Sequence, residues 1–167
     1  HPSGIDNAVA TYGRFLRYRA GEPPEIRLIQ PAHSLRIVIG MSGVESLTAK
    51  MVARVRAARE RHPTLYERIF DEIDALALEG TEAIESGDLP RLGELMNVCQ
   101  GLLNSLQVSS WEIEELVQIA RDHGAFGAKV TGGGGGGSMI ALCPDDAGRV
   151  VRAIHDAGYQ AMEVTIE

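Results

Sequence analysis

The strongest chemical signal in the sequence is a run of six consecutive glycines, residues 132–137, between two short apolar segments. Glycine adopts positive φ without a Cβ penalty and lets backbone N–H groups approach an anion closely. Thr131 and Ser138 flank the run with hydroxyl donors, and Lys129 can add positive charge. The pattern therefore predicts a loop that faces a phosphate. A flexible linker is the alternative, but linkers join domains, and both flanking segments are expected in one sheet.

Two nucleotide-binding motifs are excluded for this run. Gly132, Gly134 and Gly137 satisfy the G-x-G-x-x-G pattern of dinucleotide-binding folds, but that pattern must open a helix. Here residues 138–143 have the apolar character of a strand, and Pro144 ends it. A Walker loop requires Lys-Ser/Thr after the glycines, and Ser-Met stands there instead.

Asp6 is the second candidate for chemistry. Its carboxylate can accept the proton of a hydroxyl group or orient that hydroxyl. However, Ser3 and Asp6 also have the S/T-x-x-acid spacing of a capping box, which would only start a short helix. Residue types and spacing leave both interpretations open.

Periodicity and turn residues predict the elements that position these candidates. Residues 14–19 and 26–29 flank a turn-forming cluster and predict a β-hairpin, and residues 35–40 read as a buried strand. Four amphipathic helices are expected between residues 44 and 124, the first running from Val44 to the His-Pro pair at 62–63. Two of the others are predicted to begin at capping boxes. These boxes are Thr64 with Glu67, and Ser109 with Glu112.

Two strands, a helix and a half-exposed strand complete the chain after residue 127. The resulting β-α…α-β-β-α-β order predicts an α+β fold. Its core is a ferredoxin-like split βαβ sheet with helices inserted in the first crossover, preceded by the N-terminal β-hairpin. We expect residues 1–34 to form a segment carrying Asp6 and the hairpin, and residues 35–167 to form the domain.

Composition and charge argue against several classes of function. The 167 residues, 44% of them hydrophobic, suffice for one domain with a real core. A net charge of −7 with scattered basic residues argues against nucleic-acid binding. The sequence has no apolar run of membrane-spanning length, and we expect a cytoplasmic protein without a membrane partner. Neither the two cysteines nor the five histidines have metal-ligand spacing, so no metal site is expected.

Four segments resemble motifs of mevalonate kinases, a family in the GHMP small-molecule kinase superfamily. Residues 2–7, P-S-G-I-D-N, resemble the family's P-S-G-[VI]-D-N, and residues 129–138 resemble its K-L-T-G-A-G-G-G-G-C. Residues 42–53 resemble T-G-x-x-x-S-T-K…V-A, and residues 103–109 resemble L-x-x-L-G-V-S. The departures include Gly133 for Ala, Ser138 for Cys, Gln107 for Gly and Leu47 for Ser. The four matches span nearly the whole chain.

The resemblance implies transfer of the ATP γ-phosphoryl group to the 5-hydroxyl of mevalonate, a step of isoprenoid precursor synthesis. It implies that Asp6 is catalytic and that Lys129 is structural or peripheral. The implied substrate-binding residues are Ser3, Gly4, Arg17 and Thr48, with Arg19 as a weaker candidate than Arg17. The implied loop at the phosphates comprises Thr131, Gly132, Gly133, Gly134, Gly135, Gly136, Gly137 and Ser138.

The resemblance also implies that this chain is the C-terminal half of a two-domain enzyme. The active-site lysine, the ATP phosphate loop and the magnesium ligands would then lie in the N-terminal half, so the chain alone is expected to be inactive and not to bind ATP and Mg²⁺ tightly. The apolar surface that faces the missing domain would be exposed, and a homodimer is possible. The alternatives are another GHMP-superfamily kinase, or a non-catalytic ferredoxin-like module that binds a small ligand.

Overall fold

The computed structural model describes residues 4–167. Its amino-terminal part contains α1 (Ile5–Tyr12), β1 (Leu16–Arg19), β2 (Glu25–Leu28) and β3 (Leu35–Met41). The helical middle contains α2 (Thr48–Arg61), α3 (Pro63–Ser86), α4 (Leu89–Ser105) and α5 (Trp111–Asp122). The last part contains β4 (Gly127–Thr131), β5 (Ser138–Leu142), α6 (Ala147–Asp156) and β6 (Gln160–Ile166). None of the helices in residues 4–167 combines the length and apolarity needed to cross a bilayer.

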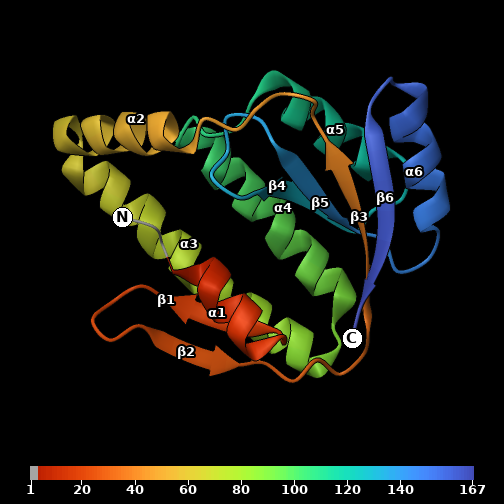
Figure 1. Ribbon diagram of the computed structural model, residues 1–167, viewed down its shortest axis with the longest axis horizontal. Helices are drawn as coiled ribbons and strands as arrows, with labels where there is room; N and C mark the ends of the chain where they lie inside the picture. Colours follow the sequence, from red (N-terminus) through yellow and green to blue (C-terminus); the bar gives the residue numbers. More distant parts are fainter. Residues whose placement is uncertain (1–3) are drawn as a thin grey trace.

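The main sheet has the strand order β4-β5-β3-β6, with every neighbouring pair antiparallel (Figure 1). β3 lies between β5 and β6, so the β5–α6–β6 unit is split, and β5 likewise separates β3 from β4. This arrangement confirms the predicted ferredoxin-like sheet with four helices inserted in its first crossover. β1 and β2 pair separately as the predicted antiparallel hairpin.

Each face of the sheet is covered by helices from a different part of the chain. On one face α5 and α6 bury Ile113, Leu116 and Ile154 against Val38 and Met139, all with 0% exposure. On the other face α3 and α4 contribute a second apolar cluster. That cluster contains Ala83 and Leu92 with Leu35 and Leu142. The alternation of side chains along β3 and β5 assigns their residues to these two layers.

At the outer edge of β4, side chains and not another strand form the hydrogen bonds to the backbone. Gln100 on α4 accepts a hydrogen bond from Val130 N–H at 2.7 Å, and Asn97 accepts one from Ala128 N–H at 3.1 Å. Arg121 on α5 donates to the Ala128 carbonyl at 3.1 Å. An unpaired strand edge would otherwise leave backbone groups without partners. These contacts fix β4, the strand that leads directly into the glycine run.

Three predicted helix starts are wrong, those of α2, α3 and α5. α2 begins at Thr48, so Val44 and Leu47 lie in the preceding loop and are exposed. α3 begins at Pro63 and has no side-chain cap, so Thr64 and Glu67 do not form the predicted capping box. Proline is favoured at the first helical position because its fixed φ suits a helix and it has no N–H to satisfy.

The cap of α5 is Ser110, one residue after the predicted Ser109. The Ser110 hydroxyl accepts a hydrogen bond from Ile113 N–H at 3.4 Å. The Ser109 hydroxyl instead accepts one from the buried Gln100 amide at 3.1 Å. The Ser109 hydroxyl, which the local spacing predicted as the cap of α5, is thus used in a tertiary hydrogen bond to Gln100.

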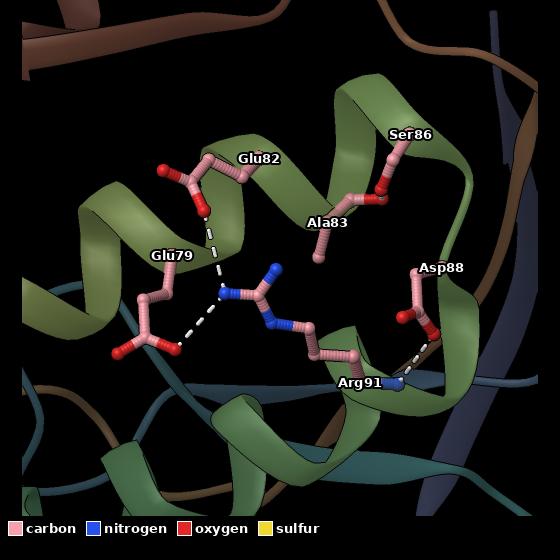
Figure 2. Close-up of polar contacts among 6 residues, drawn as sticks. All are labelled: Glu79, Glu82, Ala83, Ser86, Asp88 and Arg91. Carbon is pink, nitrogen blue, oxygen red and sulfur yellow. Dashed lines mark hydrogen bonds and ion pairs between the residues drawn. The ribbon is translucent and has the colours of Figure 1, made fainter.

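The α3–α4 connection lies at Gly87 and Asp88, the C-cap of α3 and the N-cap of α4. Gly87 has a φ of 75°, and the Asp88 carboxylate accepts a hydrogen bond from Arg91 N–H at 3.1 Å (Figure 2). The Arg91 guanidinium reaches back across the turn to Glu79 at 3.1 Å and Glu82 at 3.4 Å. These two carboxylates stabilise the charged guanidinium and raise the pKa of Arg91, and the hydrogen bond to Glu79 is the main cause.

Replacing Asp88 by alanine should destabilise the chain by about 1 kcal/mol, the usual cost of losing an N-cap side chain. The matched control is Glu79→Gln, which weakens a solvent-exposed ion pair and should have a smaller effect because such pairs contribute little. Urea unfolding midpoints compare the two variants. An equal or larger loss in Glu79→Gln would contradict the capping role.

Candidate active site

A cleft of about 880 Å³ opens where the amino-terminal helix, the β3–α2 loop and the glycine run meet. Its walls come from the start of α1, the loop before α2, the end of β4 and the start of β5. The lining residues are Ile5, Asp6, Val9, Ser46, Thr48, Thr131, Gly132, Gly133, Gly137 and Ser138. The structure therefore brings Asp6, Thr48 and the glycine run, which lie far apart in the sequence, to one cavity.

Asp6 lies in the first turn of α1, which begins at Ile5 directly after the N-cap Gly4. Gly4 has a φ of 83°, and a Cβ there would lie 2.8 Å from the Tyr18 hydroxyl oxygen. Both the backbone conformation and the close approach of Tyr18 favour glycine at this position. Asp6 is exposed in the first turn of α1, where the helix dipole favours a carboxylate. Ser3 lies outside the described residues.

The glycine run requires glycine for two separate reasons. Five of its residues have positive φ, as predicted for a tight loop that exposes backbone N–H groups. These are Gly132, Gly134, Gly135, Gly136 and Gly137. Gly133 lies outside that region, but a Cβ there would overlap the side chain of Thr48. The run is therefore a specifically folded loop, and the linker interpretation is wrong.

Hydrogen bonds hold this loop to two other segments. Gly135 N–H donates to the Val108 carbonyl at 2.7 Å, and Gly137 N–H donates to the Val44 carbonyl at 2.8 Å. The Gly137 carbonyl accepts from the Ser42 hydroxyl at 2.8 Å and from Ser42 N–H at 2.9 Å. The loop between β3 and α2 and the loop between α4 and α5 thus fix its shape.

Ser46 is a cleft residue that sequence reasoning missed. Its hydroxyl donates to the Gly134 carbonyl at 2.7 Å and lies 3.3 Å from the Thr48 hydroxyl. Ser46 therefore links the glycine loop to the start of α2 and lines the cleft itself. Its position inside the segment 42–53, which includes Thr48, was the available signal.

The cleft combines one carboxylate with backbone N–H groups that have no protein acceptor among the described residues. Asp6 is the only ionisable side chain among the described lining residues. α2 begins at the cleft, with Leu47 at its N-cap and no side-chain cap, so the positive end of its dipole lies beside the site. In residues 4–167, the N–H groups of Gly132 and Gly133 donate to no protein acceptor. These donors suit an anion.

Three charged residues considered at the sequence level lie away from this lining. Arg17 on β1 donates to Glu25 at 2.6 Å, and Arg19 pairs with Asp74 at 3.3 Å. Lys129 lies on the face of β4 that is covered by α3 and α4, where its amine donates to the Val130 carbonyl at 2.6 Å. The cleft gains its anion-binding character from backbone groups and not from these three cations.

The described lining of the cleft supplies at most one carboxylate ligand for a magnesium ion. Mg²⁺ is usually held through one or two carboxylates together with substrate phosphates. Residues 4–167 contain no group of three or more His, Cys, Asp or Glu placed to hold a metal ion. The cleft offers the single carboxylate of Asp6.

Comparison with protein families identifies a domain in the chain. The family described as "GHMP kinases C terminal" matches residues 81–160. The mevalonate kinase of Pyrococcus abyssi is 42% identical over 165 residues, covering 96% of this chain and 48% of that protein. The chain spans about half the length of the curated relatives it matches.

Solved structures agree in fold. The L. major mevalonate kinase in complex with R-mevalonate superimposes with a TM-score of 0.94 at 32% identity, covering 100% of this chain and 53% of that one. The Streptococcus pneumoniae phosphomevalonate kinase in complex with phosphomevalonate and AMPPNP has a TM-score of 0.83. At 17% identity, with 98% of this chain and 56% of that one covered, it shows the fold alone.

Proposed function

The chain contains the C-terminal domain of the GHMP kinase family, and from that premise we propose that it forms one half of an ATP-dependent mevalonate kinase. The reaction would transfer the γ-phosphoryl group of ATP to the 5-hydroxyl of mevalonate. One observation carries the proposal: Asp6 and the glycine loop line the same cleft although more than half of the chain separates them. A carboxylate beside anion-binding backbone donors suits part of the task of phosphorylating an alcohol, because the first can act on the hydroxyl and the second can hold phosphate oxygens.

Asp6 is proposed to act on the substrate hydroxyl. As the hydroxyl oxygen bonds to the γ-phosphorus, the bond from that phosphorus to the leaving oxygen of ADP breaks. The hydroxyl proton passes to the Asp6 carboxylate, or the carboxylate orients the hydroxyl for attack. Phosphoryl transfer depends mainly on positioning and on stabilising charge. The placement of Asp6 in the first turn of α1 keeps its carboxylate exposed in the cleft.

The glycine loop is proposed to hold phosphate oxygens, with the cleft hydroxyls orienting the substrates. Gly132 and Gly133 offer N–H groups, and Thr48 and Ser138 offer hydroxyls. Gly4 and Ser3 would shape the turn that presents Asp6. Arg17 is the proposed partner of the mevalonate carboxylate, which would replace Glu25 as the acceptor of its guanidinium.

An N-terminal half is proposed to complete this site. Exposed apolar side chains flank the cleft on α1 and before and within α2. They are Ile5 at 40%, Val9 at 48%, Leu47 at 49% and Val52 at 52% exposure. A covering domain would bury this surface and supply the cation, the ATP phosphate loop and the Mg²⁺ ligands that the described cleft does not contain. In this proposal residues 1–34 form the segment between the two domains, and a second copy of the chain is the alternative cover.

A chimera tests the function directly. This chain would replace the matching C-terminal half of the Pyrococcus abyssi mevalonate kinase, to which it is 42% identical. The expected result is ATP-dependent phosphorylation of mevalonate. It would be measured with an assay coupled to ADP release and by mass spectrometry of the product. The unmodified P. abyssi enzyme is the reference, and the isolated chain should show no turnover.

Alternative substrates separate the competing functions. Phosphorylation of galactose or homoserine but not mevalonate would replace the proposal with another GHMP-superfamily activity. A chimera that unfolds cooperatively but phosphorylates none of the three would contradict the kinase assignment. Tight binding of a small effector by the isolated chain would then favour a ligand-binding module.

A further inference from the structure

A second cavity, of about 240 Å³, lies between α3 and α4 on the face of the sheet that they cover, and it shares no lining residue with the cleft. Its walls are apolar except for one amine and one thiol. The lining residues are Ile73, Leu76, Ala77, Gly80, Leu92, Leu95, Met96, Cys99 and Lys129. A cavity of this size is smaller than the pockets that hold drug-sized ligands, which suits a short aliphatic chain.

Lys129 reaches this cavity because side chains alternate along β4. Ala128 and Val130 are buried in the core formed with α5 and α6, so Lys129 projects to the opposite face. Its amine makes one hydrogen bond, to the Val130 carbonyl at 2.6 Å, which leaves other positions on the nitrogen for a ligand. The side chain is only partly buried, so it lies at the boundary between apolar walls and solvent.

The surroundings of the Lys129 amine destabilise its charged ammonium form. Burial lowers the pKa of Lys129, because an apolar environment disfavours the ammonium form. Cys99 on α4 is the only other titratable residue lining the cavity, and burial raises the pKa of its thiol, which favours the uncharged form. The α3 residues that line the cavity are Ile73, Leu76, Ala77 and Gly80, which carry no charge.

We propose that Lys129 is a modification site that forms an imine with a short aliphatic aldehyde whose alkyl chain occupies this cavity. The lone pair of the amine nitrogen forms a C–N bond to the aldehyde carbon. The carbonyl oxygen then leaves as water, taking up the two protons lost from nitrogen. Neither an oxidant nor a metal is needed. The site is independent of the kinase cleft and of the function proposed for it.

The composition of the chain provides an internal control, because Lys50 and Lys129 are its only lysines. Lys50 is exposed in the first turn of α2. The folded chain would be incubated near neutral pH with sodium cyanoborohydride and either hexanal or formaldehyde, and peptide mass spectrometry would give the label at each lysine. Formaldehyde has no alkyl chain, so it reports the reactivity of each amine without cavity binding.

We expect hexanal to label Lys129 severalfold more than Lys50, with a Lys129-to-Lys50 ratio higher than the ratio for formaldehyde. Gly80→Leu should lower the hexanal ratio by filling the cavity. Gly80→Ala, whose Cβ would lie 3.9 Å from Leu92 Cδ1, adds a smaller group without a clash and should have an intermediate effect. A hexanal ratio no higher than the formaldehyde ratio, or one that Gly80→Ala leaves unchanged in a folded chain, would overturn the proposal.

Discussion

Replacing Asp6 by asparagine in the chimeric enzyme should lower kcat for mevalonate phosphorylation by about 10²–10⁴-fold, the usual contribution of a positioned acid–base group. Asparagine keeps the size and hydrogen-bonding reach of the side chain but cannot accept the hydroxyl proton. KM for mevalonate should change less than kcat, because an amide can still bind the substrate hydroxyl. Steady-state kinetics at saturating ATP measure both quantities.

Asp146→Asn is the matched control for this substitution. Asp146 caps α6, where it accepts a hydrogen bond from Arg149 N–H at 3.0 Å, and it does not line the cleft. Asparagine is as good an N-cap as aspartate, so kcat and the melting temperature should stay close to those of the chimera. If Asp6→Asn leaves kcat as high as Asp146→Asn does, Asp6 is not the proton acceptor.

Much of the fold followed from the sequence because its signals are local and repeated. β6 alternates Met162, Val164 and Ile166 with polar residues, and it pairs along β3 over its full length. Gly87 and Asp88 end one helix and begin the next as their residue types require. These elements need only one periodicity or one backbone preference, so a single sequence suffices to place them.

Helix starts were less predictable because several groups compete for the same hydrogen bonds. Ser109 and Ser110 are chemically equivalent caps, and only the position of the buried Gln100 decides which hydroxyl α5 uses. At α3 the backbone preference of Pro63 fixes the start before Thr64 can cap it. Both decisions depend on groups outside the local spacing that a capping box describes.

The residues of the candidate site also differ in how far the sequence predicted them. Asp6, Thr48 and the glycine run carried signals of residue type and of family resemblance, and the structure brings them to one cleft. Ser46 lies inside the resembling segment 42–53 but at an unspecified position of its motif, and its contact with the Gly134 carbonyl joins residues 88 positions apart. Arg17 was selected because its charge complements the carboxylate of the substrate that the resemblance implies, and its ion pair with Glu25 depends on the hairpin register.

The glycine loop offers a matched pair of substitutions that separates strain from packing. Gly132 and Gly134 have φ values of 75° and 74°, so alanine at either position should cost about 1–2 kcal/mol of backbone strain. A Cβ at Gly132 would meet no heavy atom within 4 Å, whereas a Cβ at Gly134 would overlap the Val108 carbonyl oxygen. Overpacking adds about 1–3 kcal/mol, so Gly134→Ala should be the less stable variant.

Activity should follow the same order, although Gly134 does not line the cleft. Moving Gly134 away from Val108 would displace its carbonyl from Ser46 and disturb the Gly135 N–H bond to Val108, which hold the loop beside Thr48. In the chimera, Gly134→Ala should therefore lower kcat/KM more than Gly132→Ala at a temperature where both are folded. Thermal melts and kinetics test this together. Equal losses in the two variants would show that the loop's contacts with its neighbours do not set the geometry of the site.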